Sequence, residues 1–531
     1  MNTPLTPVRC LYRGVDLYGK KLGVVSGGCR YTYSQFGERC ERLAAGLRGE
    51  GVLPGERVAF LSFNNNQLLE GYYGAPLIRA IVMPLNVRLT PAELTEILNH
   101  AEPRVLIFEN DFAPLMPGFR KVCPSVKRYV AIDATAPEAD LTYEALISAE
   151  PIERPDLFSF DENEIAELFY TSGSTGTPKG VALSHRTLYL HALGCLSSAP
   201  ELYDTDVALH TIPLFHANGW GTAQTSTMAG LKQVMVRRFE PANVLRLIEE
   251  EQATTMSLVP VMANALLNCS DLGKYNLSSL REIGIGGAAS SPELIARMER
   301  AFGCRVISGY GLTETSPLVS MSRDKGTLKP ATEEDRLFHL SMAGWPVVGN
   351  EVRVVDSRMR DVPRDGEAVG EIVVRGDNVM DGYFREPEAT ASVMTDGWFH
   401  TGDMAVWDEE TYIHIVDRKK DIIISGGENV SSIELEKAIF AHPCVLECAV
   451  VAAPDPQWGE VPAAIVVLKP GQQLDREMLV GFLEKRVAKF KLPRIIQFAE
   501  GPLPKTGTGK ILKRELRETF WTGKERRVQG G

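Results

Sequence analysis

The sequence has no long hydrophobic run: none of its apolar stretches approaches the ~20 residues of a membrane-spanning helix. Its first residues also lack the apolar core of a secretory signal, so we expect a cytoplasmic protein. Basic residues are not in excess, since 57 Lys and Arg stand against 68 Asp and Glu. The resulting net charge of −11 argues against a nucleic-acid partner, so any phosphate that binds should be held locally.

The cysteine patterns of metal and redox sites are also absent. The 9 cysteines include no C-x-x-C pair and no zinc-like spacing with histidine, which predicts reduced and mostly buried thiols. Hydrophobic residues at 44% and charged residues at 24% are typical of a folded globular protein and exclude gross disorder. With 531 residues, the chain is longer than one hydrophobic core usually serves, so we expect at least two domains.

The order of apolar runs predicts an α/β fold. Between residues 57 and 110, strand-like runs alternate with two helical patterns, and the second helix should begin at Thr90 with a capping box completed by Glu93. A second alternation follows between residues 207 and 260, with helices expected near 221–230 and 241–251. Parallel sheets with crossover helices should therefore form most of the large domain.

Two later segments change in character. Residues 352–376 contain short β-like runs, which predicts a small antiparallel β subdomain. After the charged run DRKKD at 417–421, strand patterns stand between helical patterns near 432–441 and 475–489. We therefore expect a large N-terminal domain over residues 1–416 and a small C-terminal α/β domain over 422–531, which a hinge at 417–421 would make mobile. A solvated loop without motion is the alternative for residues 417–421.

The run YTSGSTGTPKGV at residues 170–181 is rich in Gly, Ser and Thr and contains one cation, Lys179. Backbone amides can approach an anion closely where side chains are small, so this run is expected to bind phosphate. It is not the P-loop of nucleotide hydrolases, because Lys179 follows Pro178 and precedes Gly180. The run GTGK at 507–510 also fails that motif, which would require Gly at 504 and Ser or Thr at 511.

Seven motifs, which follow one another along the chain, are the basis of a resemblance to a known family. The resemblance covers residues 30 to 517. They are YTSGSTGTPKGV (170–181), PLFHANGW (213–220), GGAASSPEL (286–294), GYGLTETSP (309–317), GWFHTGD (397–403), DRKKDIIISGGENVSSIELE (417–436) and PKTGTGKI (504–511). With these motifs, the chain resembles the adenylate-forming enzymes, which include acyl-CoA synthetases, standalone adenylation domains and firefly luciferase. It looks most like bacterial medium- and long-chain fatty acyl-CoA synthetases.

The resemblance implies a two-step reaction. A small-molecule carboxylic acid attacks the α-phosphate of ATP and gives acyl-AMP and pyrophosphate, and the thiol of coenzyme A then displaces AMP. ATP, Mg²⁺ and coenzyme A are the expected cofactor and co-substrates. The first step brings two anions together, so cations and amides around the phosphates should supply most of the catalysis.

The resemblance also implies roles for individual residues. Lys510 corresponds to the catalytic lysine, Asp403 to the residue that binds the ribose hydroxyls, and Glu314 with Thr171 to the magnesium ligands. Catalytic roles are expected for Lys510, Glu314 and His216. The expected ATP and AMP site comprises Thr171, Ser172, Gly173, Ser174, Thr175, Gly176, Lys179, Gly287, Ser308, Gly309, Tyr310, Gly311, Thr313, Asp403, Arg418 and Lys420.

Two further sites follow from the same resemblance. The acyl site should comprise His216, Ala217, Gly219, Trp220, Gly286, Gly287 and Ala288, with Trp220 as a gate to an apolar tunnel. After the C-terminal domain rotates, Gly426, Gly427 and Glu428 should reach the coenzyme A entrance. Residues 284–289 also fit the dinucleotide pattern G-x-G-x-x-A, but the acidic residue that this pattern requires downstream is absent.

Several alternatives stay open. Histidine at 216, where amino-acid-activating relatives usually have aspartate, argues against an amino acid substrate. Ile424 and Asn429 replace a lysine and a tryptophan of close long-chain relatives, so contacts in that loop can differ. An aryl or other hydrophobic acid is the main alternative substrate, and a carrier protein is the alternative acceptor. A luciferase-like oxygenase would retain nearly all these motifs. The family often forms dimers, so a homodimer is one assembly to test.

Overall fold

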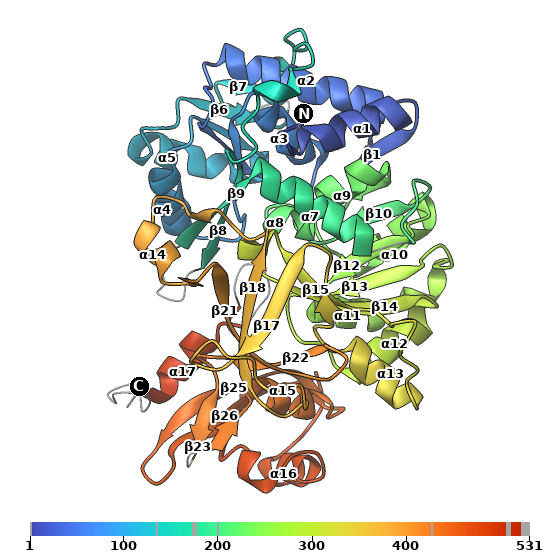
Figure 1. Cartoon of the computed structure of the whole chain (residues 1–531), viewed down its shortest axis with the longest axis vertical. Helices are drawn as coiled ribbons and strands as arrows, with labels where there is room; N and C mark the ends of the chain where they lie inside the picture. The colour runs from blue at the N-terminus through green and yellow to red at the C-terminus, as the bar shows by residue number, and fades with distance from the viewer. Residues whose placement is uncertain are drawn as a thin grey trace.

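The computed structural model describes residues 3–133, 136–172, 178–198, 201–425, 428–505 and 511–521. Among these residues, no helix is both long and apolar enough to cross a membrane. Four sheets organise the described chain: one of nine strands, one of eight and two of five. The two large sheets lie in the upper part of Figure 1, and the orange and red C-terminal residues form its lower end.

The eight-stranded sheet comes from the N-terminal part of the chain. Its parallel part was expected, because the runs at 57–110 form successive parallel strands. At one edge of the sheet, three strands pair in antiparallel order, and the outermost strand includes residue 383. The strand order is β19 (Gly382–Tyr383), β9 (Pro178–Ser184), β8 (Ile165–Ser172), β4 (Ile81–Pro84), β3 (Arg57–Leu61), β5 (Val105–Phe108), β6 (Arg128–Ala131) and β7 (Leu141–Thr142).

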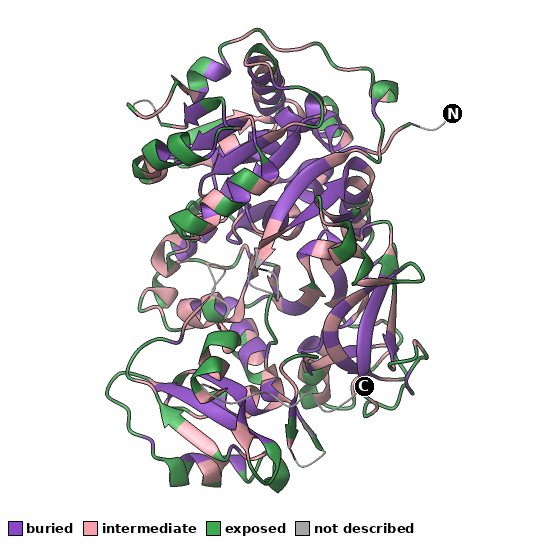
Figure 2. Cartoon of the chain, turned by 90° about the vertical axis from the view of Figure 1, so that its left-hand side faces the viewer, coloured by how far each residue is buried: buried purple, intermediate pink, exposed green. Residues whose placement is uncertain are grey.

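The nine-stranded sheet is parallel at its centre and antiparallel at both sides. Its central strands are mostly buried, as expected when helices cover both faces of a sheet. Figure 2 shows that strands of the molecule are mainly buried (purple), while many of the helices around them have exposed (green) faces. The strand order is β16 (Trp345–Pro346), β15 (Leu318–Ser322), β14 (Arg305–Gly311), β13 (Glu282–Ile285), β12 (Thr255–Leu258), β10 (Val207–His210), β11 (Lys232–Met235), β1 (Leu22–Ser26) and β2 (Cys29–Thr32).

Helices cover these sheets as distinct layers. A shared core joins both large sheets with α1 (Val8–Tyr18), α2 (Tyr33–Gly49), α3 (Asn66–Leu77), α7 (His185–Ser198) and α9 (Thr222–Ala229). The other face of the nine-stranded sheet carries α10 (Pro241–Glu251), α11 (Pro260–Leu267), α12 (Pro292–Phe302) and α13 (Glu333–Leu340). The other face of the eight-stranded sheet carries α4 (Pro91–Ala101) and α5 (Met116–Val122). Short helices are α6 (Tyr143–Leu146), α8 (Ala217–Trp220) and α14 (Pro387–Ala391).

The two five-stranded sheets follow along the chain. The first is antiparallel, as predicted from residues 352–376, and contains β17 (Asn350–Val355), β18 (Gly370–Gly376), β20 (Met394–Thr395), β21 (Trp398–Trp407) and β22 (Ile413–Arg418). The second contains β23 (Ile423–Ser425), β24 (Glu428–Val430), β25 (Val445–Asp455), β26 (Gly459–Leu468) and β27 (Ile495–Phe498). It packs with α15 (Ser432–Phe440), α16 (Arg476–Leu483) and α17 (Lys513–Trp521).

Local sequence signals explain several element boundaries. Helix α4 begins where predicted, because Thr90 accepts a hydrogen bond from the Glu93 amide and the Glu93 side chain accepts one from the Thr90 amide. The helix predicted near 475–489 is wrong at its end, since α16 stops at Leu483. The chain turns there, and Val487 and Leu492 pack against the C-terminal core instead of continuing a helix.

Candidate active site

The candidate site lies where parallel strands of the nine-stranded sheet end. Strands β10, β12, β13 and β14 run in the same direction, so the residues that follow them meet at one edge. A cavity of about 1210 Å³ is lined by residues from these strand ends. Those residues include His210, Val259, Gly286, Gly287 and Tyr310. The fold therefore gathers motifs that are far apart in the sequence.

Glycines allow the backbone to come close at this edge. A side chain at Gly311 would place its Cβ 1.9 Å from the carbonyl oxygen of Pro317, so no other residue fits without a backbone shift. Gly287 has φ +73°, a conformation that L-amino acids rarely adopt. The buried Ser308 hydroxyl also lines the cavity and has no hydrogen-bond partner within the described chain. These features leave room and an open polar group for a ligand.

Asp403 lies behind the cavity lining, where two residues that do line the cavity hold it. It is 3% exposed and pairs in register with Arg418 across β21 and β22. Arg418 Nε lies 2.7 Å from Asp403 Oδ1, and the Tyr310 hydroxyl donates to Asp403 Oδ2 at 2.8 Å. Burial beside the Asp403 charge raises the pKa of Tyr310 well above its ordinary value, so this hydroxyl stays a donor. The three predicted nucleotide residues are thus in direct contact.

Glu314 belongs to a second cluster on the same cavity. It is part of the short 3-10 helix Thr313–Thr315, and the Tyr383 hydroxyl donates to its Oε1 at 3.0 Å. Burial raises the pKa of Glu314, while this hydrogen bond and the Arg418 charge lower it. Lys179 Nζ lies 4.7 Å from the centre of the Tyr383 ring. Tyr383 therefore links the predicted phosphate cation to the predicted magnesium ligand.

Tyr383 is a residue that the sequence analysis missed. It reaches the site because β19 pairs with β9, which places Tyr383 opposite Val181. Thr171 also lines the cavity and pairs with Lys179 across β8 and β9. No local pattern announces a contact between segments about two hundred residues apart, so only the folded sheet reveals it.

The donor set fits a metal ion that binds few protein oxygens. Within the described ranges, no group of three or more His, Cys, Asp or Glu side chains could hold a metal. Mg²⁺ commonly binds one or two carboxylates and completes its shell with water and phosphate oxygens. Glu314 supplies a carboxylate to the lining of the cavity, and Thr171 supplies a hydroxyl to the same lining.

A tryptophan, Trp220, lines the part of the cavity that was predicted to bind the acyl chain. A Cβ at Gly286 would stand 3.3 Å from ring atoms of Trp220, and one at Gly287 would stand 3.2 Å from them. The indole ring therefore packs directly on these glycines. The other residues expected at the acyl site, His216, Ala217, Gly219 and Ala288, also line the cavity.

Other predicted residues have different outcomes. Gly309, Thr313 and Lys420 line the cavity, and burial lowers the pKa of Lys420. Glu428 is exposed on β24, an edge strand of the C-terminal sheet, so in this conformation it lies outside the cavity wall. The predictions that fall outside the described residues are those for Gly173, Ser174, Thr175, Gly176, Gly426, Gly427 and Lys510, together with the side chain of Ser172.

Comparison with known proteins identifies the family. The model of the AMP-binding enzyme matches residues 12–384, and that of the AMP-binding enzyme C-terminal domain matches residues 434–510. The chain belongs to the AMP-binding enzymes. This confirms the resemblance drawn from the motifs.

Relatives within the AMP-binding enzymes activate several kinds of acid. A long-chain-fatty-acid–CoA ligase of Thermus thermophilus is 42% identical over 96% of this chain and 94% of its own length. A peroxisomal butyrate–CoA ligase of Arabidopsis thaliana is 35% identical over 97% and 93%. A feruloyl-CoA synthase of Amycolatopsis is 38% identical over 93% and 95%. The predicted reaction class, an AMP-forming acid–thiol ligase, is therefore confirmed.

Solved structures of AMP-binding enzymes share the fold. The anthranilate CoA ligase AuaEII, in complex with anthranoyl-AMP, has a TM-score of 0.88 and 27% identity, covering 98% of both chains. ATP-bound MatB from Rhodopseudomonas palustris has a TM-score of 0.86 and 28% identity, covering 97% of this chain and 99% of its own. The predicted fold class is thereby confirmed, with parallel sheets, a small antiparallel sheet and a C-terminal domain.

Proposed function

We propose that this protein converts a medium- or long-chain fatty acid into its acyl-CoA. The observation that carries the proposal is one cavity that joins the polar cluster of Glu314 and Arg418 to an apolar wall. A fatty carboxylate at the junction would face the cations, while its chain would lie on the apolar part. That part includes Phe215, Met256, Val259, Pro260, Met262 and Ile285.

In the first step, a carboxylate oxygen would bond to the α-phosphorus of ATP as the bond to pyrophosphate breaks. Both partners are anions, so a cation between them should lower the barrier most. We assign this cation to Lys510. Lys505 and Leu512, which flank Lys510 in the sequence, line the cavity, and this supports the assignment.

Other residues would hold the nucleotide. Asp403 would accept hydrogen bonds from the ribose hydroxyls, and Lys179 would contact the phosphates. Glu314 and Thr171 would hold Mg²⁺, which when bound neutralises charge on the phosphates. Tyr383 would keep the Glu314 carboxylate in place through the hydrogen bond described above.

In the second step, the sulfur of coenzyme A would attack the acyl carbon, the bond to the AMP oxygen would break, and the thiol proton would pass to solvent. We propose that, before this attack, residues 422–531 rotate about residues 417–421 and bring Gly426, Gly427 and Glu428 to the thiol. Helix α17 supports a coupled movement, because Arg517 pairs with Asp421 at 3.3 Å and Lys513 pairs with Glu436 at 2.8 Å.

An aryl acid is the second candidate substrate. The feruloyl-CoA synthase relative and the anthranilate ligase structure favour it, since both proteins act on ring-bearing acids by name. A carrier protein is the second candidate acceptor of the acyl group. We also propose a cytoplasmic location, and gel filtration with light scattering would test for a homodimer.

A panel of aliphatic and aryl acids, assayed with and without coenzyme A, tests this function. We expect pyrophosphate release to depend on the acid, and thioester to form only when coenzyme A is present. Preference for ferulate or anthranilate over acids of eight to sixteen carbons would replace the fatty-acid assignment. Pyrophosphate release without any thioester would favour a carrier protein as acceptor.

A further inference from the structure

The turn before α9 consists of the short helix α8 and Gly221, and its backbone has a left-handed conformation that L-amino acids avoid. All residues at 217–221 have positive φ values, from 44° at Asn218 to 77° at Gly221. Ala217, Asn218 and Trp220 carry side chains, so each meets the steric penalty of the left-handed region. Contacts from outside the turn must therefore hold it in this form.

A buried carboxyl group lies behind this turn. Glu167, on β8, is completely buried and accepts a hydrogen bond from Asn218 Nδ2 at 2.9 Å and one from Gln224 Nε2 at 2.6 Å. Within the described residues, no cation pairs with Glu167 within 4.0 Å. A buried carboxyl group without a cation costs folding free energy, so its two hydrogen bonds must supply a compensating gain. They join the eight-stranded sheet to the turn through Asn218 and to helix α9 through Gln224.

The turn controls where Trp220 lies. Ring atoms of His191 would be 2.1 Å from a Cβ at Gly221, which leaves the end of the turn little freedom to shift. The Trp220 ring in turn packs on Gly286 and Gly287 across the cavity. Glu167 is thus connected to Trp220 through Asn218, which lies in the same turn as Trp220.

We propose that Glu167 is a positioning residue that sets substrate preference. Through Asn218 and Gln224, it holds residues 217–221 in the left-handed form and thereby fixes Trp220 across the acyl end of the cavity. The proposal rests on the proposed function, because it concerns the acid that this cavity accepts. We call the hydrogen bonds from Asn218 and Gln224 to Glu167 the clamp. When the clamp is lost, Trp220 should move and the cavity should accept longer acids.

Two variants break the clamp from opposite sides. Glu167→Ala removes the carboxyl group, and Asn218→Ala removes its link to the turn. Both should raise the ratio of kcat/KM for a sixteen-carbon acid to that for an eight-carbon acid by on the order of tenfold, while KM for ATP stays unchanged. Glu167→Gln should keep the wild-type ratio, because its amide can donate to Asn218 Oδ1 once the Asn218 amide turns over. Among the described residues, this oxygen is a buried acceptor without a partner.

A matched control separates positioning from general destabilisation. Glu70 on α3 is also completely buried, and Arg39, Tyr143 and Asn66 bind it. Glu70→Gln should lower the melting temperature without changing the ratio of the two acids. Acrylamide quenching provides a second readout. For each protein, the contribution of Trp220 is the difference in quenching between that protein and its Trp220→Phe counterpart. This contribution should be larger in Glu167→Ala than in the wild type, and in Glu167→Gln it should equal the wild-type value.

The outcomes distinguish this inference from the proposed function. Folded Glu167→Ala and Asn218→Ala proteins with the wild-type ratio and the wild-type quenching would overturn the positioning role. A wild-type protein that releases no pyrophosphate with any acid would instead overturn the proposed function. In that case, the quenching of Trp220 still tests whether Glu167 holds the turn.

Discussion

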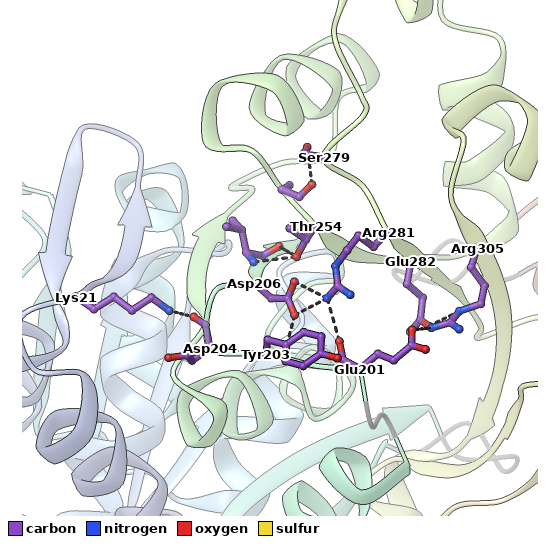
Figure 3. Close-up of polar contacts among 12 residues, drawn as sticks. Lys21, Glu201, Tyr203, Asp204, Asp206, Thr254, Ser279, Arg281, Glu282 and Arg305 are labelled. Carbon is purple, nitrogen blue, oxygen red and sulfur yellow. Dashed lines mark hydrogen bonds and ion pairs between the residues drawn. The ribbon is translucent and has the colours of Figure 1, made fainter.

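The two ends of the parallel strands in the nine-stranded sheet differ in how their polar groups are used. At the amino ends, charged residues bind one another: Arg281 contacts both carboxylate oxygens of Asp206 at 2.5 Å, and Arg305 Nε donates to Glu282 at 3.0 Å (Figure 3). At the carboxyl ends, glycines line the cavity together with the Ser308 hydroxyl, which has no partner in the part of the chain that the structure describes. The comparison indicates that one edge stabilises the fold and the other binds ligands.

The largest expected effect is on the rate of the first step, and it comes from Lys510, the cation that we assign to the cavity at the carboxyl ends of the strands. Lys510→Ala should slow acid-dependent pyrophosphate release on the order of a hundredfold, which corresponds to about 3 kcal/mol for one lost oxyanion partner. Its unfolding free energy should not change. Lys505→Ala is the matched control, because Lys505 is paired with Glu447 on the near side of the same segment. Wild-type pyrophosphate release by purified Lys510→Ala would remove Lys510 from the mechanism.

A pair of arginine variants tests the two edges against each other. Arg281→Ala leaves the buried Asp206 without its partner and should lower the unfolding free energy by about 2 kcal/mol, with kcat/KM unchanged. Arg418→Ala leaves the similarly buried Asp403 and should instead raise KM for ATP. Denaturant unfolding and steady-state kinetics of both variants provide the test. A kinetic defect in Arg281→Ala that matches that of Arg418→Ala would erase the distinction between the edges.

The pH dependence of the free energy of unfolding should reveal the protonation of the Glu167 carboxyl group. Burial raises its pKa from 4.5 to about 8, although the hydrogen bonds from Asn218 and Gln224 lower it in part. Between these values the folded chain keeps a proton that the unfolded chain has lost, so the free energy of unfolding should fall as pH rises. The slope is at most about 1.4 kcal/mol per pH unit.

Glu167→Gln carries no such proton and should lack this slope. Cys10 and Tyr72 also face Glu167, and burial raises the pKa of both, so they stay neutral in this window. Urea unfolding of wild type and variant at pH 5, 6, 7 and 8 gives the comparison. Two parallel stability curves would show that Glu167 is ionised throughout.

The smallest expected effect concerns Tyr383. Tyr383→Phe keeps the ring beside Lys179 but removes the hydroxyl that orients Glu314, so half-saturation by Mg²⁺ should rise about fivefold, or ~1 kcal/mol. Tyr310→Phe removes a comparable hydroxyl from Asp403 and should affect KM for ATP instead. Equal magnesium dependence in wild type and Tyr383→Phe would exclude this positioning role.

Much of the fold and many site residues could be predicted from local sequence. Gly286, Gly309 and Tyr310 were expected together because their motifs resemble those of the adenylate-forming enzymes, and the structure places all three in the lining of one cavity. The capping box at Thr90 likewise depends only on neighbouring residues. These features share one property, because each is set by residues that are close in the chain or by a regular alternation.

The remaining features depend on distant pairings. Tyr383 joins the site through β19 and β9, and Asp403 meets Arg418 through the register of β21 and β22. Glu167 looks like one polar residue in an apolar strand until α9 brings Gln224 to it. No sequence pattern fixes such registers, so these contacts could be found only in the structure.

The fate of an isotope label tests the central claim most directly. Wild-type protein is supplied with ATP, coenzyme A and a fatty acid that carries ¹⁸O in both carboxylate oxygens. If the carboxylate attacks the α-phosphorus, AMP should contain one ¹⁸O and the thioester should retain the other. Unlabelled AMP, or label in pyrophosphate or inorganic phosphate, would contradict formation of an acyl adenylate.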